Sequence, residues 1–218
     1  MSKLNFKLFS KINFSVQDPI LLIEACCIQS DFYVNYDIIA VDRERNIFDV
    51  NKIGGRTNEN VLKKCFEVIN DSAVKIITSY TLDSFQELEN KEKKELVKEL
   101  DTKIVKKLLS IKGIGLSKVT KILHTLFPEI CPMIDNPLQQ IYKQQINNSW
   151  KAESLEELLI QFYENLANVE NKDNLNRLHR ELTPLNLTKI RIFDIIWWSY
   201  LKSLGPKRKG ISWKIFNN

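Results

Sequence analysis

The sequence predicts a mainly α-helical protein, because turn-forming residues are scarce and apolar residues recur at helical spacing. The 218 residues include only 6 Gly and 6 Pro, fewer than an all-β domain with many tight turns requires. Hydrophobic residues make up 44% and charged residues 27% of the chain, a composition that argues against disorder. A chain of this length buries about 70% of its unfolded surface, so neither a disulfide nor a metal is required for folding.

Three segments predict helices outside the central region. Residues 18–30 form an apolar segment in which Asp18 supplies the N-cap and Pro19 the first helical residue. A further helix is expected over residues 59–69. Residues 83–100 carry six acids and four Lys, which is typical of a solvated amphipathic helix. Its predicted inward face consists of Phe85, Leu88, Leu96 and Leu100.

A small β-hairpin near the N-terminus is predicted between the first two helices. Residues 36–41 and 47–53 are β-prone and lie on either side of a charged turn. Two glycines at residues 54–55 then end the pattern.

Charge is unevenly distributed along the chain, whose formal net charge is +5. Residues 101–125 hold six Lys against one Asp, and residues 187–218 hold seven bases against one acid. Between them, residues 151–181 hold seven acids against four bases. If the two basic segments converge in space, they form an electropositive surface suited to a phosphate backbone. Two ordinary solvated faces are the alternative.

The four cysteines, Cys26, Cys27, Cys65 and Cys131, include no C-x-x-C pair and no His at ligand spacing. Neither a zinc site nor an iron–sulfur cluster therefore has its ligands, and we expect reduced, buried thiols. No signal-peptide pattern and no run of eighteen apolar residues is present. We accordingly expect a cytoplasmic protein without a membrane partner.

Residues 102–126 predict two short helices packed on each other, since apolar residues follow i, i+3, i+4 spacing on both sides of a glycine turn. In that turn Gly113 and Gly115 permit positive φ and let a ligand approach the backbone. The free amide groups and the positive dipole end of the second helix can bind a phosphate, although a glycine turn that only links two core helices has the same sequence. Lys112 and Lys118 add charge beside it. Binding of this kind reads the nucleic-acid backbone and not its sequence.

This segment resembles the helix-hairpin-helix motif, and its continuation resembles the helix-hairpin-helix DNA glycosylase superfamily. In that superfamily an apolar, often Pro-containing segment leads to an aspartate about twenty residues after the second hairpin glycine. Here Pro132-Met133-Ile134 precedes Asp135, which follows Gly115 by twenty residues. The resemblance covers about forty residues, from 102 to 142. The DNA-binding residues that it implies are Lys112, Gly113, Ile114, Gly115, Ser117 and Lys118.

The resemblance also implies a two-lobed helical domain over residues 1–218, with the motif at 102–126 followed by a catalytic loop at 127–137. Residues 188–202 add to it, since they look like the Arg-x-x-Asp-x-x-x-Trp helix of poorly characterised bacterial proteins that resemble 8-oxoguanine glycosylases. Apolar residues surround this segment almost completely, so a central core helix is the other interpretation, with Arg191 and Asp194 paired for structural reasons.

Asp135 is the catalytic candidate of a base-excision N-glycosylase. As the base leaves, positive charge builds on the sugar, and a fixed carboxylate stabilises it and orients the nucleophile. An Asp before a helix is also a common N-cap. We expect Asn136 and Pro137 to start the helix instead, which leaves Asp135 facing the groove.

Three departures from the superfamily pattern bear on the chemistry. Ser117 stands where strand-nicking members have a Schiff-base lysine, and Lys118 lies about 100° further around the helix. Water is therefore the expected nucleophile, which makes the enzyme monofunctional. Asn136-Pro137 replaces the usual Thr-His, and the iron–sulfur cysteines of one branch are absent, which leaves substrate and activity open.

An excised base needs a pocket with aromatic walls. The aromatic residues that could supply them, or belong to the core, are Tyr142, Trp150, Phe162, Trp197, Trp198 and Trp213.

The expected partner is duplex DNA, bound by a monomer. No cofactor is expected, although a monovalent cation at the hairpin is left open. The basic tail at 205–210 contacts DNA or is simply solvated. Two alternatives to the glycosylase stay open: a catalytically inactive helix-hairpin-helix DNA-binding protein, and a purely structural helical protein.

Overall fold

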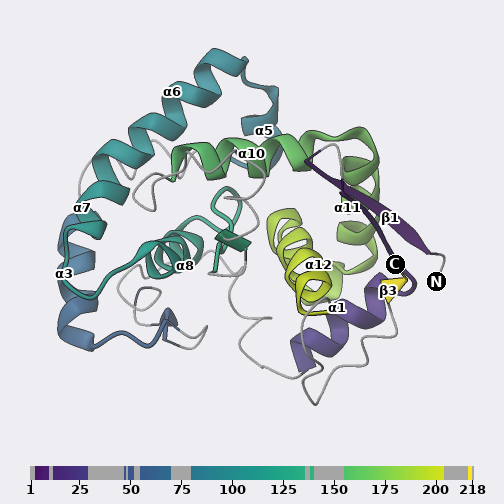
Figure 1. Cartoon of the computed structure of the whole chain (residues 1–218), viewed down its shortest axis with the longest axis horizontal. Coiled ribbons are helices and arrows are strands. Elements are labelled where there is room, and N and C mark those ends of the chain that lie inside the picture. The colour runs from purple at the N-terminus through teal and green to yellow at the C-terminus, as the bar shows by residue number, and fades with distance from the viewer. Residues whose placement is uncertain are drawn as a thin grey trace. The chain divides into compact units, whose positions relative to one another are not determined.

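The computed structural model describes residues 3–9, 12–28, 47, 49–51, 55–69, 80–135, 138–139, 155–203 and 216–217 (Figure 1). Its strands are β1 (Leu4–Leu8), β2 (Ile12–Val16) and β3 (Phe216–Asn217). Its helices are α1 (Pro19–Ile28), α3 (Glu59–Ile69), α5 (Leu82–Glu87), α6 (Asn90–Leu100), α7 (Lys106–Leu109), α8 (Leu116–Leu126), α10 (Glu156–Ala167), α11 (Val169–Glu181) and α12 (Lys189–Ser203). The predicted mainly helical fold class is confirmed. Among the described helices, none is long and apolar enough to cross a membrane.

The chain divides into two compact units. The terminal unit combines Met1–Ile38 with Tyr163–Asn218 and contains the three strands, α1, α11 and α12. The central unit, Ile39–Phe162, contains α3 and the helices from α5 to α8. The boundary between the units falls within α10.

A β-hairpin and a buried helix form the core of the terminal unit. β1 and β2 pair antiparallel, with Phe6 opposite Phe14, and their inward side chains alternate with outward ones as a half-buried sheet requires. The ring of Phe6 lies 6.5 Å from that of Phe193 in α12, and Trp197 is fully buried on the same helix. The core interpretation of residues 188–202 is thus confirmed, including a buried ion pair between Arg191 and Asp194.

The outer edge of β1 is paired with asparagine side chains instead of another strand. The amide of Asn171 accepts from the Lys7 N–H (2.9 Å) and donates to the Lys7 carbonyl (2.6 Å). Asn165 accepts from the Phe9 N–H (2.8 Å), and Asn174 donates to the Asn5 carbonyl (2.5 Å). These contacts satisfy backbone groups that an edge strand leaves open to other chains.

The β-hairpin was predicted in the wrong place. Residues 36–41 lie outside the described residues, whereas Ile47 and Asp49 are helical and not extended. Ile47 and Val50 are both buried, and a spacing of three residues brings side chains to one face of a helical turn, not of a strand.

The start and N-cap of one helix and the bounds of another were predicted. α1 begins at Pro19, where the Asp18 carboxylate accepts from the Leu21 N–H (3.0 Å), and α3 spans residues 59–69. The single helix predicted over 83–100 is wrong, because the chain breaks between α5 and α6 and each part begins with its own capping box. Phe85 and Leu100 are buried as predicted, whereas Leu88 and Leu96 are half-buried.

A π-helical turn, η1 (Asp101–Val105), joins α6 to α7 without interruption. The first helix of the predicted hairpin is therefore the end of a longer helical run. A π turn brings residues i and i+5 together, and the Lys106 ammonium lies 3.1 Å from the Asp101 carboxylate. Asp101 is buried, and its other oxygen faces the Leu155 N–H (3.5 Å) at the start of α10.

Candidate nucleic-acid interface

Residues 110–115 form a tight turn between α7 and α8, as the sequence predicts for residues 102–126. Gly113 has φ +92°, a conformation that L side chains rarely adopt. The Ile114 N–H donates to the Ile111 carbonyl at 3.0 Å, and the Ile114 side chain is buried. Gly113 is thus required by the turn, and Ile114 anchors the turn to the protein instead of facing a ligand.

Gly115 is the N-cap of α8, yet the fold does not require a glycine there. Its backbone angles, φ −111° and ψ 173°, are ordinary extended values. A Cβ at this position would meet no atom within 4 Å. Gly115 has no side chain that could cap the first turn of α8; its carbonyl accepts from the N–H groups of Lys118 (2.9 Å) and Val119 (3.0 Å), and the residue itself is exposed. The missing side chain therefore leaves open space directly in front of a helix amino terminus.

The two predicted lysines lie on either side of this turn. Lys112 is exposed, and Lys118 is half-buried with its ammonium donating to the Gly113 carbonyl at 2.9 Å. An ammonium has three N–H donors, so Lys118 fixes the turn and still adds positive charge there.

Two polar side chains of α8 hold the segment that leads to Asp135. The Thr120 hydroxyl accepts from the Ile134 N–H (3.1 Å) and lies within donating distance of the carbonyls of Ser117 (3.1 Å) and Ile134 (3.3 Å). Four residues on, the His124 Nδ1–H donates to the Cys131 carbonyl (2.7 Å). Both side chains are buried. Asp135, next after Ile134, therefore follows a backbone segment that is fastened to the second turn of α8.

Neither Thr120 nor His124 was predicted from the sequence. Their signal is a polar pair at i, i+4 beside the apolar positions Val119, Ile122 and Leu123 of α8, since residues four apart share a helix face. Such a pair predicts that the two side chains hydrogen-bond to polar groups in the core, but it does not identify the residues that supply those groups.

The structure gives Asp135 the capping role that we expected Asn136 to take. The carboxylate of Asp135 lies 3.4 Å from the Leu138 N–H, and its carbonyl accepts from the Gln139 N–H at 2.9 Å. These are the contacts of an N-cap residue. Asp135 is half-buried, and Gln139 also donates to the Ile134 carbonyl at 2.9 Å. The carboxylate is thus held in a fixed orientation by the helix that it starts.

The other candidates divide between core residues and residues outside the described part of the chain. Phe162 and Trp197 are buried core residues, and Trp198 is half-buried. Tyr142, Trp150, Trp213 and the basic tail at 205–210 lie outside the described residues. The two basic segments belong to different units, so their convergence stays a prediction. Arg191 adds nothing to such a surface, because it is buried in its ion pair with Asp194.

All four cysteines are buried free thiols, as predicted. Burial raises the pKa of Cys65 to about 11 and that of Cys131 to about 12. Burial also raises the pKa of Cys26, although a hydrogen bond with Ser199 and the charge of Arg191 oppose it. A thiol is nucleophilic only as its thiolate, so these three cysteines are poor nucleophiles at neutral pH.

No cluster of three or more His, Cys, Asp or Glu side chains that could hold a metal ion occurs among the described residues. In comparisons with known proteins, no family model, no curated protein and no solved structure matches this chain.

Proposed function

We propose that the glycine turn between α7 and α8 binds the phosphate backbone of duplex DNA, and that the protein is a monofunctional DNA N-glycosylase of base-excision repair. The binding part of the proposal depends on one observation, the presence of a glycine at position 115. Its backbone angles and surroundings would accept any side chain, and glycine is a slightly weaker N-cap than Asp, Asn or Ser. A ligand that approaches the amide groups of α8 would explain why glycine, and not a residue with a side chain, stands at this position.

The position of Asp135 supports the catalytic part of the proposal. Thr120 joins the backbone of Ile134 to α8, and α8 begins at the turn that we propose to bind phosphate. A carboxylate that does not need to reorient during the reaction is what stabilisation of a sugar cation requires. Its capping bond to Leu138 uses Oδ1. In the proposed reaction this carboxylate orients water against the anomeric carbon, while the base leaves.

The capping bond also favours a second candidate function, a DNA-binding protein without chemistry. In that case Asp135 starts its helix and does nothing else, and the glycine turn still binds phosphate. Excision from a panel of damaged and mismatched duplexes separates the two functions. A protein that binds these duplexes and excises no base belongs to the second class.

Replacing Gly115 tests the binding part directly. Gly115→Asp is expected to raise the stability of the protein by a few tenths of a kcal/mol, because Asp is a better N-cap than Gly. The same change is expected to weaken duplex binding by about tenfold or more, since a carboxylate then occupies the place of a phosphate. Fluorescence anisotropy with unrelated duplexes, repeated over a range of salt concentrations, measures the affinity, and a thermal melt measures the stability.

Two controls separate this effect from general charge repulsion. Gly115→Asn adds a neutral side chain of the same size and should weaken binding less than Gly115→Asp. Asn90→Asp adds the same charge at an exposed position of α6 in the same unit and should change affinity little. Equal binding by the wild type and all three variants would remove the glycine turn from the interface.

The absence of a lysine at position 117 predicts the reaction type. Borohydride should trap no covalent protein–DNA adduct, and the product should be an intact strand with an abasic site until alkali cleaves it. The measurement is gel analysis of the reaction with and without borohydride. An adduct that disappears in Lys118→Ala would assign the nucleophile to Lys118 and overturn the monofunctional mechanism.

A further inference from the structure

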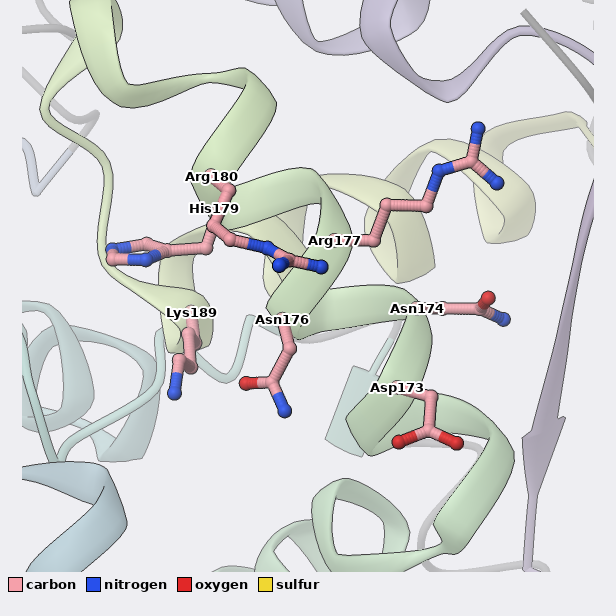
Figure 2. A pocket seen from close by; sticks show the side chains of 7 residues that line it. All are labelled: Asp173, Asn174, Asn176, Arg177, His179, Arg180 and Lys189. Carbon is pink, nitrogen blue, oxygen red and sulfur yellow. The ribbon is translucent and has the colours of Figure 1, made fainter.

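A polar groove of about 720 Å³ lies on the terminal unit, along α11 and the first turn of α12 (Figure 2). It is lined by Asp173, Asn174, Asn176, Arg177, Arg180 and Lys189, together with His179. Every described residue that lines it is polar or charged. In Figure 2, Arg177 and Asn174 extend toward one end and His179 and Lys189 toward the other, with Arg180 and Asn176 between them. We call this feature the basic groove.

The chain turns back sharply to bring α12 beside α11. A 3-10 turn, η2 (Thr183–Leu185), follows α11, and Asn186 then adopts φ +50°, a left-handed conformation that Asn tolerates better than most residues. Thr188 caps α12 through a bond from the Arg191 N–H (3.1 Å). Lys189 is therefore held at the start of α12, where it lines the groove together with residues of α11.

Positive charge dominates the lining. Arg177, Arg180 and Lys189 are opposed by one carboxylate among the lining residues, that of Asp173. Residues 173, 176, 177 and 180 share one face of α11, because they are spaced three, four and seven residues apart. The Arg177 Nε lies 2.9 Å from a Glu181 oxygen. This bond orients the guanidinium and leaves its other N–H groups as donors.

Helix stability explains only part of this charge. Arg180 lies in the last turn of α11, where a cation interacts favourably with the helix dipole. Lys189 is the first residue of α12, where a cation is unfavourable, and no acidic residue in that first turn compensates it. The positive end of α12 also adds to the potential of the groove. The position of Lys189 is therefore not explained by the dipole of α12.

We propose that the basic groove binds consecutive phosphate groups of a DNA strand. Cations from two elements, in a lining of polar and charged residues, suit several linked anions and do not suit a stacked base or an apolar ligand. The preference for phosphate follows from the lining alone. That the phosphates belong to DNA rests on the proposed function.

The test uses the full chain and the double variant Arg180→Gln/Lys189→Gln. Its control, Lys3→Gln/Lys172→Gln, removes the same charge from two exposed residues of the same unit that do not line the groove. Duplex affinity is measured by anisotropy from 0.05 to 0.4 M salt. We expect the groove variant to bind about tenfold more weakly near 0.1 M salt and to lower the slope of log K against log salt by about 2, whereas the control changes both much less.

A second arm titrates inorganic tripolyphosphate into the same three proteins by calorimetry. Equal duplex affinity and salt slope for the groove variant and its control would overturn the proposal. If the wild type binds no duplex, the DNA assignment fails together with the proposed function. Tripolyphosphate binding that only the groove variant loses would then assign the groove to a free polyphosphate. If Gly115→Asp still binds duplex and the groove variant does not, the groove is a DNA-binding site and the glycine turn is not.

Discussion

Asp135→Asn is expected to lower the single-turnover rate of base excision by roughly 10²–10³-fold and to leave the fold intact. Asn caps a helix about as well as Asp, so the bond to the Leu138 N–H can be kept. What the variant loses is the negative charge that faces the developing sugar cation. Stability and chemistry are separated at this position because the structure assigns the first to the capping oxygen and the proposal assigns the second to the charge.

The measurement is excision under single-turnover conditions on whichever substrate the duplex panel yields, beside a binding titration and a thermal melt. Duplex binding through the glycine turn should persist, since Asp135 contributes no positive charge to it. Asp83→Asn is a matched control, because it removes an exposed carboxylate from α5 of the same unit. Excision by Asp135→Asn at the wild-type rate would identify the carboxylate as a cap alone.

Asn171→Ala is expected to lower the free energy of unfolding by about 3–5 kcal/mol. Asn171 is fully buried, and its amide bonds both the N–H and the carbonyl of Lys7 as well as the carbonyl of Asn165 (2.7 Å). Truncation leaves these three backbone groups without that partner, and each buried polar group that loses its hydrogen bond costs about 1–3 kcal/mol. The total loss is expected to stay below the sum of three full penalties, because the Lys7 groups on β1 are only partly buried and water replaces some of the bonds.

Urea denaturation of Asn171→Ala and of a control variant measures the change in the free energy of unfolding. Asn174→Ala is the matched control, since it removes one exposed bond from the same helix to the same strand, and it should cost no more than about 1 kcal/mol. If Asn171→Ala lowered the free energy of unfolding no more than Asn174→Ala does, the buried contacts of Asn171 would not be what stabilises the edge of β1.

Local signals were sufficient to predict several elements. The Asp18-Pro19 pair and the apolar segment after it predict α1, and the two glycines at 113 and 115 predict the turn between α7 and α8. Such signals act within one or two helical turns, so a sequence shows them completely. The hairpin at Leu4–Leu8 and Ile12–Val16 carries an equally local signal, an alternation of apolar and polar residues. A hairpin was nevertheless predicted at residues 36–53 and not there.

The candidate site was predicted in its residues more completely than in their roles. The spacing from Gly115 predicts the importance of Asp135, but not that Asp135 itself caps the following helix. Ile114 was predicted at the interface and is buried, because an apolar residue between two glycines is needed to fasten the turn to the core. A list of residues in a turn does not say which of them face outward.

The sequence by itself determined the helical class, the Asp18 cap of α1 and the glycine turn, because each depends on residues close together in the chain. The tertiary structure alone decided which polar groups meet. Lys7 and Asn171 are 164 residues apart, Thr120 and Ile134 are 14 apart, and the groove requires α12 to turn back on α11. A hydrogen bond between distant residues leaves no pattern in a single sequence, because its two partners come together only when the core packs.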